Sequence, residues 1–255
     1  MIEIKDVTFS YVNESRNVLE RISINVPKGG ITTVLGLNGS GKTTFIKLLV
    51  NLLKPSMGTI KVNGYSIASM SIKERSKMIS YVSQLTKNDH DFIVFDYLSF
   101  SLANCLGGFR APTSKEEEKI LEYANKFKIA DLLSKRLSNL SGGERQIVSI
   151  CGAFIQNTPI IVLDEPTSAL DLKNQSIVIK AIKEWNRSKE KTIILSSHNP
   201  NHALSLGGNV ILLDDSKIIK NGSVEDIITV ENLKQVYGDI IDYAKNIKHN
   251  IIAIK

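Results

Sequence analysis

A glycine-rich segment near residue 40 has the residue types and spacing of a phosphate-binding loop. Residues 36–43 read GLNGSGKT and match the pattern G-x-x-x-x-G-K-[ST], between a predicted strand at 31–35 and a predicted helix at 43–53. The glycines let the backbone curl so that several N–H groups converge on phosphate oxygens, and the helix start adds its positive dipole end. The segment predicts binding of a nucleoside triphosphate. The expected contacts are Asn38, Gly39, Ser40, Gly41, Lys42, Thr43 and Thr44.

Two carboxylates follow a short apolar run later in the chain. Residues 160–165 read IIVLDE, which predicts a buried strand that ends in Asp164 and Glu165. At the carboxyl end of a parallel strand, Asp164 could hold Mg²⁺ together with the Thr43 hydroxyl. Glu165 could then take a proton from an attacking water, a role worth roughly 10²–10⁴ in rate. The alternative is a strand that runs into a polar turn, because Pro166 follows at once.

A second candidate anion site precedes the acidic strand. Residues 140–146 read LSGGERQ, in which Ser141 and Glu144 have the spacing of a capping box. Gly142 and Gly143 would expose the backbone N–H groups of the helix start to an anion. A purely structural interpretation, a well-capped helix, holds whatever the function is.

The elements that position these residues follow from hydrophobic periodicity. Alternation at 2–4 and 22–26 predicts antiparallel strands in a β-rich region over 2–34, and Pro55 and Gly58 should stop the helix of 43–53. From about 85 to 156 we expect a helical lobe, with one helix capped by Ser114 and Glu117. Apolar strands at 160–163, 192–195 and 210–213 then alternate with helices, including one at 174–185, which predicts a buried parallel sheet.

Composition restricts the class of protein. The 255 residues are 42% hydrophobic and 23% charged, which is typical of a globular chain, and no apolar run reaches the roughly 18–20 residues of a membrane span. The residues that follow Met1 do not have the pattern of a signal peptide, in which basic residues precede an apolar run. We therefore expect a soluble protein of the cytosol. The net charge of +6 suits nucleic acid, an anionic membrane or phosphate ligands without choosing among them. Cys105 and Cys151 form no CxxC pair and are expected to be reduced, inert thiols.

The order of these motifs resembles the ATP-binding cassette (ABC) ATPase family, since LSGGE lies between a phosphate loop and a D-E strand end. Further positions match in order over about residues 1–230. Gln84 resembles the family's Q-loop glutamine, and residues 168–171, which end in Asp171, resemble its D-loop. His198 resembles the switch histidine, and Tyr11 the aromatic that stacks on adenine. His198 and His202 are four apart, but Pro200 lies between them and no third ligand is evident, so we do not expect a metal pair.

The resemblance implies an α/β fold. It would be a P-loop NTPase (RecA-like) core with an N-terminal antiparallel β-subdomain, a helical subdomain inserted at about 85–156, and a tail, 231–255, packed on the domain of residues 1–230. ABC cassettes work as head-to-tail pairs, so Ser141, Gly142 and Gly143 would contact ATP held by the Lys42 of a second copy. Glu165 would activate water and His198 would steady the γ-phosphate. Gln84 would contact Mg²⁺ and move with the helical lobe.

The resemblance also implies partners and a location. A single cassette looks like the subunit of a bacterial importer, docked on separate permease subunits at the cytoplasmic face of the membrane and served indirectly by an extracytoplasmic solute-binding protein. The stretch 107–112 and the tail residues 236–238 resemble importers of iron–siderophore, haem or cobalamin complexes, with ferric siderophore as the leading expectation. Two features depart from the family pattern: residues 149–154, SICGAF, replace an Arg-Ala-Leu-like run, and Leu37 replaces a common proline.

Two other classes of function compete with transport. A soluble ABC ATPase of DNA repair, translation or cluster assembly agrees with the basic charge, but the chain has no sustained heptads, no second cassette and no dense basic stripe, so we expect no nucleic-acid partner. A phosphotransferase would use the same loop but would leave LSGGE and Asp171 unexplained.

Overall fold

The computed structural model describes residues 1–12, 16–84, 91–106, 112–238, 241–245 and 250–254, and at 103–106, 241–245 and 250–254 it describes the backbone alone. The stretch 107–111, used above for the transported solute, lies outside these residues. Within the described chain, no helix is both long and apolar enough to cross a membrane.

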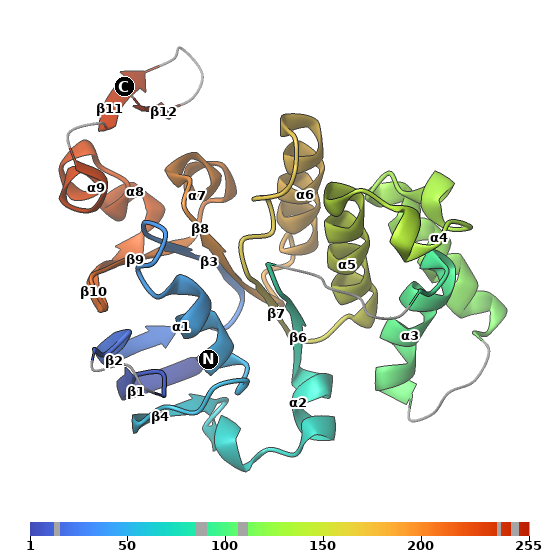
Figure 1. Cartoon of the computed structure of the whole chain (residues 1–255), viewed down its shortest axis with the longest axis horizontal. Coiled ribbons are helices and arrows are strands. Elements are labelled where there is room, and N and C mark those ends of the chain that lie inside the picture. The colour runs from blue at the N-terminus through green and yellow to red at the C-terminus, as the bar shows by residue number, and fades with distance from the viewer. Residues whose placement is uncertain (13–15, 85–90, 107–111, 239–240, 246–249, 255) are drawn as a thin grey trace.

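Two sheets build the part of the chain that surrounds the phosphate loop (Figure 1). The smaller sheet has the antiparallel order β2-β1-β4-β5, from β1 (Ile2–Phe9), β2 (Leu19–Val26), β4 (Met57–Val62) and β5 (Tyr65–Ser66). The larger has the order β10-β9-β3-β8-β7-β6. Its strands are β3 (Gly30–Leu35), β6 (Ile79–Val82), β7 (Ile160–Leu163), β8 (Thr192–Ser197), β9 (Asn209–Asp214) and β10 (Lys217–Ser223).

The larger sheet is parallel from β9 through β3, β8 and β7 to β6, as the apolar runs predicted, while β10 joins its edge antiparallel to β9. Side chains of β7 alternate between its two faces. Ile160 and Val162 pack in the cluster that contains α1 (Lys42–Leu49) and the small sheet, so α1 is held between the two sheets. Ile161 and Leu163 pack on the opposite face in the cluster that contains α5 (Gly142–Gln156). Both faces are therefore covered, which explains why the strand is apolar throughout.

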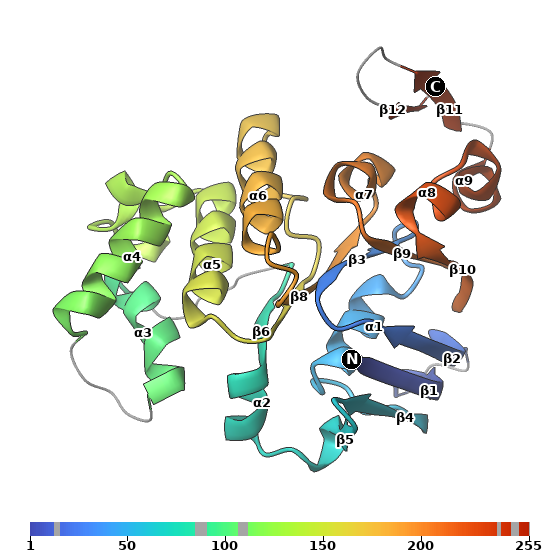
Figure 2. The same ribbon diagram turned by 180° about the vertical axis from the view of Figure 1, so that it is seen from behind.

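Helices cover the second face of the large sheet and extend to one side (Figures 1 and 2). The helices beyond the sheet are α2 (Ile72–Met78), α3 (Val94–Leu106) and α4 (Ser114–Lys126), with one-turn 3₁₀ segments at Ile67–Ser69, Ala130–Leu132 and Leu137–Asn139. Those nearer the C-terminus are α6 (Leu172–Trp185), α7 (Pro200–Leu206), α8 (Val224–Ile227) and α9 (Val230–Tyr237). The final strands β11 (Ile241–Lys245) and β12 (Asn250–Ile254) pair with each other in an antiparallel hairpin.

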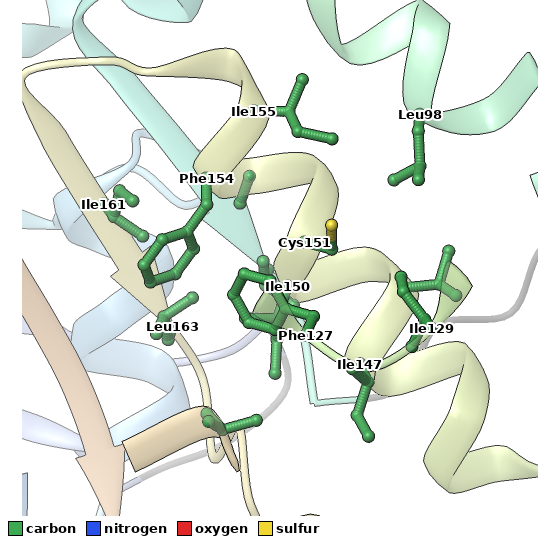
Figure 3. Packing of buried hydrophobic residues seen from close by; sticks show 14 of the residues in the cluster. Leu98, Phe127, Ile129, Ile147, Ile150, Cys151, Phe154, Ile155, Ile161 and Leu163 are labelled. Atoms are coloured by element: carbon green, nitrogen blue, oxygen red, sulfur yellow. The ribbon is translucent and has the colours of Figure 1, made fainter. Parts of the chain in front are cut away.

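Packing behind the LSGGE segment is tight despite the unusual sequence at 149–154. Phe154 lies against the β7 residues Ile161 and Leu163, while Cys151 faces α3 (Figure 3). A Cβ at Gly152 would lie 2.8 Å from the Ser101 hydroxyl oxygen, so the absence of a side chain there allows α3 to approach α5. Burial in this apolar cluster raises the pKa of the Cys151 thiol, which agrees with an inert cysteine.

Two predicted element boundaries are wrong. The cap of α4 is Thr113, whose hydroxyl and backbone N–H donate to Glu116, so the predicted pair of Ser114 and Glu117 is displaced by one residue. Helix α1 ends at Leu49 rather than at residue 53. The reason is that Asn51 takes a left-handed backbone conformation (φ 56°), and the N–H groups of the next two residues both donate to the carbonyl of Lys47.

Candidate active site

The strand order of the large sheet brings four loops to one edge. The phosphate loop follows β3, Asp164 follows β7, His198 follows β8 and Gln84 lies two residues past β6. Because β3, β8, β7 and β6 are consecutive neighbours and parallel, their carboxyl ends lie at the same edge. Segments that are far apart in the sequence therefore form one site.

The phosphate loop requires glycine at three positions. Gly39 and Gly41 have φ angles of 84° and 99°, which side-chain-bearing residues rarely adopt. A Cβ at Gly36 would lie 2.2 Å from the Leu213 carbonyl oxygen, so this turn passes directly against β9. The backbone carbonyls of Gly36 and Leu37 accept hydrogen bonds from the Lys42 ammonium at 3.0 and 2.9 Å. The loop is thus closed around the buried ammonium, and the Leu37 side chain points out, 42% exposed.

Glu165 is the centre of a polar cluster. One carboxylate oxygen lies 3.3 Å from Lys42 Nζ, and both side chains are at least nine-tenths buried. The other oxygen accepts from Gln84 Nε2 at 3.3 Å and lies 3.4 Å from His198 Nδ1. Glu165 also has a left-handed backbone (φ 44°), a conformation that costs on the order of 1–3 kcal/mol in a residue with a side chain. A water in the cavity beside this carboxylate would face a proton acceptor that is held by three separate loops.

Asp164 and Thr43 form the site expected for Mg²⁺. The Thr43 hydroxyl donates to Asp164 Oδ1 at 3.1 Å, and the Ser196 hydroxyl donates to the same oxygen at 2.7 Å. Burial raises the pKa of Asp164, and these two hydrogen bonds oppose the rise. A hydroxyl and a carboxylate are hard oxygen donors of the kind that Mg²⁺ binds, so these residues fit the ion. When bound, Mg²⁺ would supply positive charge against the β- and γ-phosphate oxygens.

A cavity of about 560 Å³ joins these groups to Tyr11. Tyr11 is 37% exposed, packs edge-on against Phe9 with ring centroids 4.9 Å apart, and shares a hydrogen bond of 3.1 Å with the Thr44 hydroxyl. An aromatic face at one end and the phosphate loop at the other suit a nucleotide. The lining residues are Tyr11, Val18, Asn38, Gly39, Gly41, Lys42, Thr43, Thr44, Gln84, Glu165, Ser168 and His198.

The LSGGE segment lies outside this cavity. Ser141 caps α5 as predicted: its hydroxyl accepts from the Glu144 N–H at 3.2 Å, and its own N–H donates to the Glu144 carboxylate at 2.8 Å. That backbone hydrogen bond lowers the pKa of Glu144, which therefore stays ionised at the helix start. Ser141 and Gly142 are exposed, and neither residues 141–143 nor Asp171 belong to the described lining of the cavity. Asp171 instead caps α6 by accepting from the Asn174 N–H at 2.7 Å.

Ser196 was missed in the sequence, and Ser168 was noted there only as the first residue of the D-loop-like stretch; both have clear places in the site. Besides contacting Asp164, the Ser196 hydroxyl accepts from the Glu165 N–H at 2.7 Å, so it orients both carboxylate residues. Its position two residues before His198, on the strand between β3 and β7, is the signal that could have identified it. Ser168 lines the cavity and donates to the Glu165 carbonyl at 3.0 Å. His202 faces elsewhere, with its ring nitrogen 3.1 Å from the Ser197 hydroxyl, and burial lowers its pKa.

A Gly-rich loop between a parallel strand and a helix, with acidic residues at the end of a neighbouring strand, defines a P-loop nucleoside triphosphatase. The family model described as "ABC transporter" matches residues 19–168. The chain therefore belongs to the ABC transporter family, and it is an ATPase of that family.

Relatives cover nearly the whole chain. This chain is 34% identical over 238 residues to a probable iron chelatin transport ATP-binding protein of Helicobacter pylori. The alignment covers 93% of this chain and 92% of the relative. The chain is 31% identical over 223 residues to an iron(3+)-hydroxamate import ATP-binding protein of Bacillus subtilis, covering 87% and 82%. Among solved structures, it is similar to a metal-chelate type ABC transporter in an inward-facing conformation, with a TM-score of 0.81, 26% identity, and 100% and 96% of the two chains covered.

Proposed function

We propose that this chain is the ATP-hydrolysing subunit of an importer of metal-chelate complexes, with ferric siderophores as the leading substrate class. The observation that carries the proposal is the similarity to two named relatives. One is named for iron chelatin transport, and its alignment covers 93% of this chain; the other is named for iron(3+)-hydroxamate import. Haem and cobalamin complexes are the other candidates. The chain would bind separate permease subunits at the cytoplasmic face of the membrane, and a solute-binding protein outside would deliver the chelate.

In the proposed mechanism, ATP lies in the cavity with its base against Tyr11 and its phosphates on residues 38–44. Lys42 would turn from Glu165 and the loop carbonyls to the β- and γ-phosphates. Asp164, Thr43 and Gln84 would hold Mg²⁺. Glu165 would accept a proton from the attacking water, with His198 steadying that water and the γ-phosphate.

We further propose that a second copy completes the site. Ser141 and Gly142 are exposed at the start of α5 and lie outside the cavity of their own chain. A helix start with free N–H groups attracts anions, so the γ-phosphate bound by one copy would attract residues 141–143 of the other. Asp171, at the start of α6, would lie in the same interface. ATP would favour the closed pair, and loss of the γ-phosphate would release it.

The test is transport by the assembled complex. The tagged chain is purified from detergent-solubilised membranes of its host, its membrane partners are identified, and the complex is reconstituted in vesicles with the solute-binding protein. ATP-dependent uptake of a ferric hydroxamate, and none by the matched Glu165→Gln complex, would support the proposal. Uptake of haem or cobalamin alone would change the substrate class. A chain that associates with ribosomes or DNA and with no membrane protein would refute the transport function.

A further inference from the structure

The C-terminal helix α9 reaches the active site through one side chain, Tyr237. Its hydroxyl donates to the backbone carbonyl of His198 at 3.1 Å. Its ring packs against the cluster that contains Leu35, the last residue of β3 before the phosphate loop. This side chain therefore contacts the loop that follows β8 and packs beside the end of β3.

The surroundings of Tyr237 keep its hydroxyl protonated. Burial raises the pKa of the Tyr237 phenol, the Gly36 backbone amide opposes the rise, and the negative charge of Glu165 adds to it. The hydroxyl is therefore neutral at physiological pH and serves as a hydrogen-bond donor. It contacts the backbone of His198 and not its imidazole, so it can act on the reaction only by fixing the loop that carries the ring.

Helix α9 is anchored by hydrogen bonds and by apolar packing, so it can hold the loop that carries His198. Asn232 is 5% exposed and makes three side-chain hydrogen bonds: its amide donates to the carbonyls of Asp226 and Ile227, and its oxygen accepts from Lys220 Nζ at 2.6 Å. Leu233 and Val236 are buried in a cluster that also contains the end of β3 and parts of β9, α7 and α8. In both views, α9 lies beside α8 (Figures 1 and 2).

The end of α9 places the tyrosine at the loops. Tyr237 is the last residue of the helix, and Gly238 ends it with a φ of 75°. The ring is half-buried against the same apolar cluster, which leaves the hydroxyl as the group that reaches His198. Apolar packing thus fixes the Tyr237 ring, and the hydrogen bond from its hydroxyl fixes the loop that carries His198.

We propose that Tyr237 is a positioning residue for ATP hydrolysis, which holds the His198 loop to α9, the helix that packs against the end of β3 beside the phosphate loop. The proposal rests on the role of His198 put forward under the proposed function. It assigns the C-terminal helix a part in catalysis: the imidazole can steady the γ-phosphate only if its loop keeps its register with the loop that binds that phosphate.

The test is Tyr237→Phe in the full chain, because phenylalanine keeps the ring packing and removes only the hydroxyl. We expect kcat for ATP hydrolysis to fall about 2- to 10-fold, the effect of losing one neutral hydrogen bond, with KM within about twofold of the original value. The matched control is Tyr65→Phe, since Tyr65 is 72% exposed on β5, and it should keep the original kcat and KM.

A double-mutant cycle separates positioning from a merely structural role. In a His198→Ala background, adding Tyr237→Phe should change kcat by less than about 1.5-fold, because the side chain that the hydroxyl positions is gone. An equal fall in both backgrounds would overturn the proposal. So would a Tyr237→Phe variant that melts earlier but keeps kcat at a temperature where it is fully folded. If His198→Ala itself keeps the original kcat, the proposed role of His198 fails first, and the role of Tyr237 fails with it.

Discussion

Replacing Glu165 by glutamine perturbs the polar cluster at a single group. The substitution keeps the shape of the side chain and the contact with Gln84, but removes the negative charge that faces Lys42 at 3.3 Å and His198 at 3.4 Å. An amide accepts a proton far less readily than a carboxylate. We expect kcat to fall by roughly 10²–10⁴, which corresponds to about 3–5 kcal/mol in the activation free energy.

The same substitution affects stability and nucleotide binding in opposite directions. Lys42 and Glu165 are both at least nine-tenths buried, so the variant leaves a buried ammonium with only the carbonyls of Gly36 and Leu37 as partners. Removing one partner of a buried ion pair is destabilising, and the nucleotide-free variant should therefore have a lower Tm. The triphosphate returns negative charge to Lys42. ATP should accordingly raise the Tm of the variant more than that of the original protein.

The assays are phosphate release at saturating MgATP, nucleotide affinity, and thermal melting with and without ATP. Size-exclusion chromatography with MgATP should show a stable dimer of the variant, because the nucleotide is bound but not hydrolysed. The matched control is Glu190→Gln, at an exposed position, with unchanged turnover and Tm. Turnover by Glu165→Gln within threefold of the original rate would refute the role of Glu165 as the proton acceptor.

Three further predictions follow from other contacts. Ser141→Arg should leave nucleotide affinity of the monomer unchanged but lower ATPase turnover at least tenfold, since the bulky cation obstructs only the partner's site; an unchanged rate in a turnover assay would contradict the shared site. Asp164→Asn should raise the Tm at neutral pH in metal-free buffer and abolish Mg²⁺-dependent hydrolysis. The reason is that the buried carboxyl has a raised pKa, so its ionisation costs stability as the pH rises above its ordinary value, and the gain should vanish in melts at acidic pH. Phe154→Ala should lower the free energy of unfolding by about 3–5 kcal/mol in urea titrations, because the ring packs 5.2 Å from Phe127 and 5.0 Å from Trp185; a loss under 1 kcal/mol would contradict its place in the core.

Several elements were predictable because their signals are local. The strand at 160–163 and the capping box of Ser141 and Glu144 agree with the structure residue by residue. The capping box depends on a contact three positions apart, and the strand leaves a local mark because burial on both faces requires an uninterrupted apolar run. The cap of α4 was misplaced because Thr113 and Ser114 are both capping residues, each with a glutamate three positions later, and the local sequence does not choose between them.

The amino-acid sequence by itself determined the chemistry available to this protein: a glycine loop that must curl, a lysine and a threonine beside it, and two carboxylates at a strand end. The tertiary structure alone decided which of these groups meet. Ser196 joins Asp164 to Glu165, and Tyr237 joins α9 to the His198 loop, because the order of parallel strands and the docking of α9 bring together residues that are 31 to 39 positions apart. No local pattern encodes such contacts, since they depend on the packing of every element between them.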